Sequence, residues 1–176
     1  MPRLIDRNGV ELPNPWAILD KDAALETVLA HASDSLIVPL GLWHAERGNL
    51  LASSKRVTVW LDSDESADAI AGDLPNLDMI ALNFPVFTDG RGYSTASCLR
   101  RHYAYEGEIR AIGDVLRDQL FYLRRCGFTT FDLKDSVKLE DARRAMRDFA
   151  DNYQATVEQP LPLFRRRLET AGTVQE

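Results

Sequence analysis

This chain has few cysteines and no long apolar run, which argues against a disulfide-rich protein and against a membrane-spanning one. The 176 residues include only two cysteines, Cys98 and Cys126, which do not form a CxxC pair. No run approaches the roughly 20 apolar residues that span a bilayer, and the first residues lack the apolar stretch of a signal peptide. We therefore expect a protein of the reducing cytoplasm, without disulfides and without membrane association, whose cysteines serve packing.

Positive charge and metal-ligand spacings are lacking as well. The formal net charge is −6, which argues against nucleic acid as a partner because phosphate binding needs a basic surface. The three histidines, His31, His44 and His102, show no HxH or HExxH spacing, so no metal site is expected. No flavin, nicotinamide, haem or iron–sulfur motif is visible, and we expect no cofactor.

What is present is an ordinary globular composition that changes near the C-terminus. Hydrophobic residues make up 45% and charged residues 27% of the chain, and the length suits one domain with a sizeable core. Residues 154–176 are polar, contain two prolines and show no periodicity. The sequence therefore predicts one α/β domain over residues 1–153, followed by a polar tail that is mobile or docks on a partner.

Strands and helices alternate through the predicted domain. A small hairpin over residues 3–13 turns at Asn8-Gly9, a pair that favours the type I′ turn. Five further strands are expected, at Ser35–Leu40, Arg56–Leu61, Met79–Phe84, Glu108–Ile112 and Thr129–Leu133. Helices are expected from Asp22, near Leu42–Arg47, from Ser63 or Asp64, from Ser94, from Asp114 to Gly127, and over residues 142–153. This alternation indicates a mainly parallel sheet of about five strands.

Four of these strands have two unlike faces. One face is apolar, with Val57, Val59, Leu61, Ile80, Leu82, Phe84, Ile109, Ala111, Phe131 and Leu133. The other is mixed, with Thr58, Trp60, Asp62, Ala81, Asn83, Glu108, Arg110, Ile112, Thr130, Asp132 and Lys134. A parallel sheet covered by helices on both faces is apolar throughout. We therefore expect a sheet like half of a β/α-barrel with a polar concave face, and a flavodoxin-like sandwich is the alternative.

Polar residues gather where the parallel strands end, and this edge carries the site in most α/β folds. The residues expected at this rim are Asp62, Asn83, Asp89, Arg91, Asp114, Asp132 and Lys134. Arg110 joins them as a candidate because it shares a strand face with Glu108 and faces the strand of Asp132. Such a charge network either perturbs pKa values at a site or forms a structural lattice of ion pairs.

The loop Thr88–Ser94 is the strongest candidate for ligand binding. Gly90 and Gly92 let backbone amides approach a ligand, Arg91 carries a planar cation, and Ser94 is expected to open a helix. Together with Asp89, these residues form a candidate site for phosphate, sulfate or a carboxylate. The structural alternative is a capped connection in which Asp89 pairs with Arg91.

Asp114 also has two interpretations. As a carboxylate at a strand end it is a candidate general acid or base. The simpler interpretation, which we favour, is that Asp114 caps the following helix.

Three long segments resemble a known bacterial family. They are Phe84–Ser94, Gly107–Gln119 and Leu123–Phe128, and Leu40–Trp43 also fits the pattern. The family is one of unknown function whose members carry the label "oxidoreductase probably involved in sulfite reduction". The similarity covers roughly residues 35–150, and the tail adds nothing to it. The family has no established catalytic residues to transfer.

The resemblance implies a setting in assimilatory sulfite reduction, since such proteins are encoded beside sulfite or nitrite reductases. Our first hypothesis is an accessory protein without redox chemistry, with sulfite reductase or another sulfur-assimilation enzyme as its partner. The second is a small α/β enzyme or sensor that binds an oxyanion or a phosphorylated metabolite at Thr88–Ser94. The third is a scaffold that forms a homodimer or larger oligomer through its polar sheet face.

Overall fold

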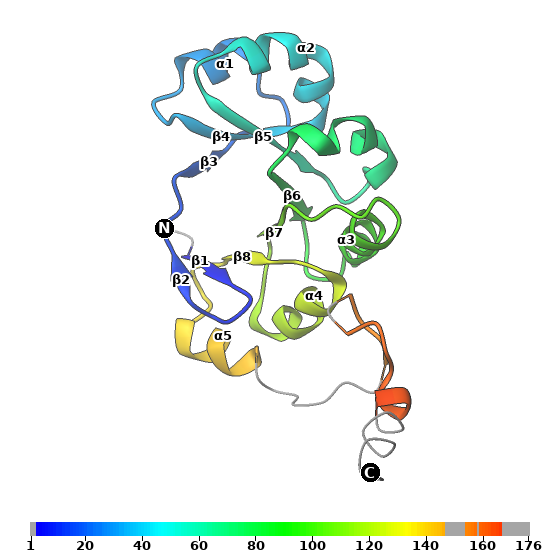
Figure 1. Ribbon diagram of the computed structural model, residues 1–176. Coiled ribbons are helices and arrows are strands. Elements are labelled where there is room, and N and C mark those ends of the chain that lie inside the picture. The colour runs from blue at the N-terminus through cyan, green and yellow to red at the C-terminus, as the bar shows by residue number, and fades with distance from the viewer. Residues whose placement is uncertain (1–2, 147–153, 158, 167–176) are drawn as a thin grey trace.

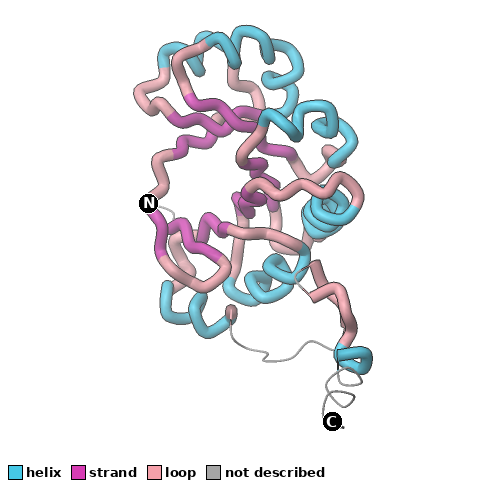
Figure 2. The backbone as a smooth tube through the Cα atoms, viewed as in Figure 1, coloured by secondary structure: helices cyan, strands magenta, loops and turns pink. Residues whose placement is uncertain are grey.

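One curled sheet organises the computed structural model, which describes residues 3–146, 154–157 and 159–166. Its strands are β1 (Arg3–Asp6), β2 (Glu11–Leu12), β3 (Trp16–Ile18), β4 (Ser35–Pro39), β5 (Arg56–Leu61), β6 (Met79–Phe84), β7 (Glu108–Gly113) and β8 (Thr130–Leu133). Their spatial order is β2-β1-β8-β7-β6-β5-β4-β3. Figures 1 and 2 show the strands bending around an open concave side, which makes the sheet a half-barrel.

The helices follow the strands and lie on the outer side of the curl (Figure 1). The α-helices are α1 (Leu25–Ala30), α2 (Leu40–Ala52), α3 (Arg91–Arg101), α4 (Leu120–Cys126) and α5 (Leu139–Ala145). Two 3-10 helices are η1 (Ala67–Asn76) and η2 (Arg117–Gln119). Within the described residues, none of the helices has the length and apolar character required to traverse a bilayer.

The sheet is mixed and has eight strands, so the expected mainly parallel sheet of about five strands was wrong. From β3 to β8 every neighbouring pair is parallel, whereas β1 pairs antiparallel with both β8 and β2. Two features account for the error. The strand Trp16–Ile18 is too short to show a period, and the N-terminal hairpin joins the main sheet through β8 instead of standing apart.

The two edge strands of this sheet are consecutive in the chain. β2 ends at Leu12 and β3 begins at Trp16, yet they occupy opposite edges of the eight-stranded sheet. Four Cα–Cα steps reach at most about 15 Å, whereas the edges of a flat eight-stranded sheet lie about 34 Å apart. The connector Pro13–Pro15 therefore requires the sheet to curl.

The predicted division into two strand faces is confirmed. Val59, Ile80, Ile109 and Phe131 are fully buried in the main core beneath the helices, as are the other members of the apolar face except the half-buried Val57. The concave face holds a second, smaller cluster that comprises Ile37, Trp60, Met79, Ala81 and Ile112, with Trp16 packed against it. The main core thus lies on the convex side, and the concave side mixes apolar and charged groups.

The hairpin forms, but its turn is not type I′. Gly9 N–H donates to Asp6 O at 3.0 Å, and Gly9 alone in this turn has a positive φ, of +77°. A type I′ turn needs positive φ at Asn8 as well. The Asp6 carboxylate instead accepts hydrogen bonds from the backbone N–H groups of Asn8 and Val10, both at 2.8 Å. This side-chain bridge stabilises a turn in which only the glycine is left-handed.

Several helix boundaries differ from those expected. α1 begins at Leu25 after Ala24, without the cap from Asp22. The uncertain segment near Leu42–Arg47 belongs to α2, which has 13 residues and a break at Glu46. α5 buries Ala142, as predicted, whereas the expected contacts of residues 149 and 153 lie outside the described residues.

Part of the predicted tail contacts the domain. Thr156 is buried, and Val157 N–H donates to Arg125 O at 3.2 Å. These contacts place at least this short segment against the end of α4. The predicted boundary between residues 153 and 154 stays a prediction.

Gly127 tests the packing of the convex side. It follows α4 with φ +107°, and a Cβ there would lie 2.6 Å from Arg100 Cγ. We expect Gly127→Ala to lower the free energy of unfolding by about 1–3 kcal/mol. An alanine here would be strained by the positive φ and by the close contact of its Cβ with Arg100. Gly48→Ala is the control, since its Cβ meets nothing within 4 Å inside α2. It should raise stability by about 0.5–1 kcal/mol. Equal changes in urea unfolding would contradict the prediction.

Candidate functional site

Asp62 is the centre of a hydrogen-bonded group at the C-terminal edge of the sheet. It follows β5, and its carboxylate accepts hydrogen bonds from Lys21 Nζ at 2.5 Å, Asn83 Nδ2 at 3.1 Å and Ser63 N–H at 2.9 Å. Partial burial would raise the pKa of Asp62, but the hydrogen bonds from Lys21, Ser63 and Asn83 outweigh it and lower the pKa. Asp62 is therefore an ionised, internally satisfied carboxylate at neutral pH.

Arg91 and Asp89 form a bidentate pair in the loop before α3. Arg91 Nε and Nη2 lie 3.0 and 2.7 Å from the two carboxylate oxygens of Asp89. These hydrogen bonds, with a smaller contribution from Ser63, hold the pKa of Asp89 well below its usual range. This is the geometry of the structural alternative for the loop. The Arg91 side chain is nevertheless 62% exposed, so oxyanion binding stays a prediction.

The helix start differs from the one on which the anion hypothesis depended. α3 begins at Arg91 with Gly90 in the N-cap position, so Ser94 lies inside the helix and does not open it. Gly92 has a packing role, because a Cβ there would meet Phe84 Cζ at 2.8 Å. The glycine at this position therefore lets the backbone of α3 approach the core side chain of Phe84, and not a ligand.

Ser63 links the two carboxylate groups. Its hydroxyl accepts a hydrogen bond from Arg91 Nη2 at 3.0 Å, while its N–H donates to Asp62. The rim cluster, as we call it, therefore consists of Lys21, Asp62, Ser63, Asn83, Asp89 and Arg91. The sequence pointed to four of these residues. Lys21 was missed because it follows β3, whose end joins the same rim, and Ser63 was considered only as a helix start.

Asp114 does not cap a helix, which corrects the interpretation favoured from the sequence. The 3-10 helix η2 begins only at Arg117, and its N-cap position is Leu116. The Asp114 carboxylate instead accepts a hydrogen bond from Lys134 Nζ across the ends of β7 and β8. This pair is separate from the rim cluster, and a role in proton transfer stays a prediction.

Arg110 and Asp132 belong to the concave face. Arg110 is 3% exposed, and its guanidinium donates to Glu108 Oε1 at 2.8 and 2.7 Å and to Asn14 Oδ1 at 3.1 Å. Thr130 Oγ1 donates to the same Glu108 oxygen at 2.6 Å. Asp132 is 5% exposed, and its Oδ1 has no hydrogen-bond partner in the described part of the chain. Burial raises the pKa of Asp132, against a smaller opposing effect of Arg110.

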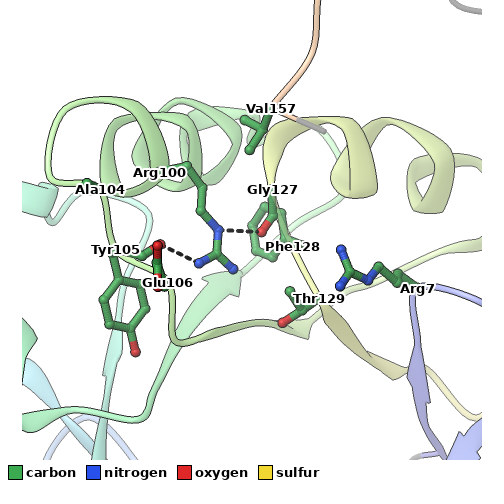
Figure 3. A pocket seen from close by; sticks show the side chains of 9 residues that line it. All are labelled: Arg7, Arg100, Ala104, Tyr105, Glu106, Gly127, Phe128, Thr129 and Val157. Carbon is green, nitrogen blue, oxygen red and sulfur yellow. Dashed lines mark hydrogen bonds between the residues drawn. The ribbon is translucent and has the colours of Figure 1, made fainter. Parts of the chain in front are cut away.

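A different cavity, of about 370 Å³, lies at the opposite end of the strands (Figure 3). Arg100 extends beside it from α3 and donates to Gly127 O at 3.0 Å, to Gly107 O at 2.8 Å and to Tyr105 O. Desolvation lowers the pKa of this guanidinium. With three backbone carbonyls bound, Arg100 fastens α3 to the segments that precede β7 and β8, and we assign it a structural role.

The cysteines and metal-ligating residues give no additional site. Burial raises the pKa of the Cys126 thiol, which opposes thiolate chemistry. Cys98 is partly buried, and both cysteines are free. Across residues 3–146, 154–157 and 159–166, His, Cys, Asp and Glu form no group of three that could hold a metal ion.

Comparison with known proteins decides the family. Residues 58–164 match the model of DUF934, a family of bacterial proteins of unknown function. The chain belongs to this family. The match confirms the resemblance to a bacterial family of unknown function, but it also includes part of the tail, where we expected no similarity. No curated protein and no solved structure matches the chain.

The Asp89–Arg91 pair gives a direct test of oxyanion binding. An anion must displace Asp89 from Arg91, so we expect Asp89→Asn to bind sulfate, sulfite or phosphate more tightly than the native chain. Arg91→Ala should bind none of them. The measurement is the thermal midpoint over an anion series at constant ionic strength. Ligands specific for the native state raise it, and identical anion responses in all three proteins would refute the site.

Arg100 provides a stability test. We expect Arg100→Leu to lower the free energy of unfolding by about 2–4 kcal/mol, because three partly buried carbonyls lose a charged donor. Arg101→Leu is the control, because the Arg101 side chain, next to Arg100 in the sequence, is exposed. This variant should change the free energy of unfolding by less than about 0.5 kcal/mol. Urea unfolding measures both. Similar losses in the two variants would contradict the structural role.

Proposed function

We propose that this protein is a cytoplasmic accessory protein of assimilatory sulfite reduction, which acts by binding a reductase and performs no redox chemistry itself. The observation that carries the proposal is the internal pairing at the rim. Arg91 is hydrogen-bonded to Asp89 and Ser63. Asp62 accepts hydrogen bonds from Lys21 and Asn83, and Asp114 accepts one from Lys134. Charged groups that satisfy one another build a rigid surface rather than a set of poised catalytic groups.

Beside this paired rim, the chain presents apolar side chains to solvent. Val86, Phe87 and Tyr122 are 54%, 51% and 50% exposed. We call these three residues the apolar edge. Exposed apolar groups that lie together are typical of protein interaction sites, and aromatic residues are enriched there.

The apolar edge is held in place by contacts between the β6–α3 loop and α4. Gln119 Nε2 donates to Phe87 O at 3.5 Å, and the rings of Tyr122 and Tyr93 meet edge to face at 4.9 Å. Tyr93 in turn packs on the buried Phe84 at 5.3 Å. These contacts order the backbone at Phe87 and the ring of Tyr122 before binding, which lowers the entropy cost of docking. The setting in sulfite reduction comes from the family resemblance alone.

Binding to the assimilatory sulfite reductase of the same bacterium tests the proposal. We expect a saturable complex in isothermal titration, weakened at least tenfold by Phe87→Ala because a central aromatic contact is lost. Leu51→Ala is the matched control, since Leu51 is an equally exposed apolar residue on α2, at 52%, and should leave binding unchanged. Sedimentation of the chain alone tests self-association, our separate prediction of a homodimer.

A deletion strain gives the test in the cell. We expect it to grow on sulfide or cysteine but poorly on sulfate or sulfite, because only the reduction step is impaired. The native gene and the Leu51→Ala gene should restore growth. Normal growth on sulfate, together with no complex in titration, would refute the proposed function.

A further inference from the structure

The concave side of the half-barrel contains a cavity that belongs to none of the sites above. Its volume is about 450 Å³, within the range of small-molecule sites. Its lining residues are Arg3, Leu4, Glu11, Leu12, Asn14, Trp16, Ile18 and Asp132. They come from β2, β1 and β8 at one side of the sheet, from the edge strand β3 at the other side, and from the connector between β2 and β3. The cavity therefore exists only because the sheet curls.

The walls of this cavity are largely apolar, and one of them is aromatic. Trp16 stands at one edge, where the guanidinium of Arg56 lies 5.0 Å from its ring centroid. Leu4 is buried on the other side and pairs in register with Asp132. Ile18, 42% exposed, marks the opening to solvent. The apolar part of a small ligand can enter this space and lie against the indole ring of Trp16.

Asp132 is the buried polar group in the lining that such a ligand would contact. It is 5% exposed, and its Oδ1 is buried without a hydrogen-bond partner in the described residues. A buried carboxylate without donors costs free energy, so most such groups are hydrogen-bonded. Rotation about the terminal side-chain bond of an aspartate is soft and nearly two-fold, so either oxygen can turn toward the cavity.

The nearby cation does not satisfy this carboxylate. The Arg110 guanidinium donates hydrogen bonds to Glu108 and Asn14. Glu108 receives a further hydrogen bond from Thr130. This network holds Arg110 away from hydrogen bonding with Asp132 while both stay buried on the same face. The lining also includes Glu11 and Arg3, so with Asp132 the acidic groups of the cavity outnumber the basic one.

We propose that this cavity is a binding site for a small organic cation, in which an ammonium or amidinium group donates hydrogen bonds to Asp132 and an apolar body packs between Trp16, Leu4 and Leu12. A charged donor would satisfy the buried carboxylate at close range, where such hydrogen bonds are strong. The indole of Trp16 adds a favourable surface for a cation or a planar ring. The site is independent of the apolar edge, so it can fail while the proposed function holds.

Benzamidinium and benzylammonium are the probes, and benzoate is their anionic counterpart. With the full-length, isotope-labelled chain, we expect both cations to shift the amide resonances of Leu4, Leu12 and Trp16 with a common saturable dissociation constant. Benzoate should not bind. Asp132→Asn should weaken both cations at least tenfold, while Asp118→Asn, which removes a 75% exposed carboxylate, should not change them.

A second variant removes the space and keeps the carboxylate. Ile18→Trp at the opening should block both cations, and its thermal midpoint shows independently that the chain is folded. The proposal is overturned if neither cation gives saturable shifts at these residues, if benzoate binds as well as the cations, or if Asp132→Asn binds them as tightly as the native chain does.

Discussion

The connector Pro13–Pro15 is the constraint on which the rest of the structure depends. It joins the two opposite edges of the sheet and can reach only about 15 Å. The sheet must therefore curl, helices must pack outside the curl, and the concave face must be small and partly enclosed. Asn14 reinforces the constraint from within, because its side-chain oxygen Oδ1 accepts a hydrogen bond from the buried Arg110 on β7. A three-residue segment thus fixes the shape of an eight-stranded sheet.

The two faces of the sheet follow from this geometry. The convex face has helices to cover it, and residues such as Val59 and Phe131 make a continuous apolar core. The concave face has no layer of its own, so its charged groups must find partners within the curl or across it. Arg110 donates to Glu108 and Asn14, whereas Oδ1 of Asp132 has no donor among the residues that the structure describes. At the rim, where water is near, the carboxylates of Asp62, Asp89 and Asp114 pair with cations instead.

The sequence predicted the half-barrel and the two faces of its strands, but only four of the six residues of the rim cluster. Period-2 patterns in β5 to β8 reveal both faces, because alternation is a local property of a strand. The strand Trp16–Ile18 has too few residues to show alternation, and missing it also hid Lys21. Asp89 and Arg91 were expected to pair or to bind an anion, and the distances favour the first. The prediction that Asp114 caps a helix was wrong, because η2 begins only at Arg117 and the Asp114 carboxylate pairs with Lys134. Arg110 and Asp132 lie inside β7 and β8, so they belong to the concave face and not to the rim cluster, which begins after β5.

The hairpin and β8 are neighbours in the sheet but lie at opposite ends of the described domain, since Arg3 pairs with Leu133. On a ribosome that adds about 5–20 residues per second, the hairpin emerges well before its pairing strand. About 130 residues later, after roughly 6–26 seconds, β8 arrives and the curl can close. Until then the edge of β1 and the connector are unprotected, and unpaired strand edges are prone to association. The feature that fixes the shape of the finished protein therefore leaves the hairpin of the nascent chain unprotected until β8 has been made.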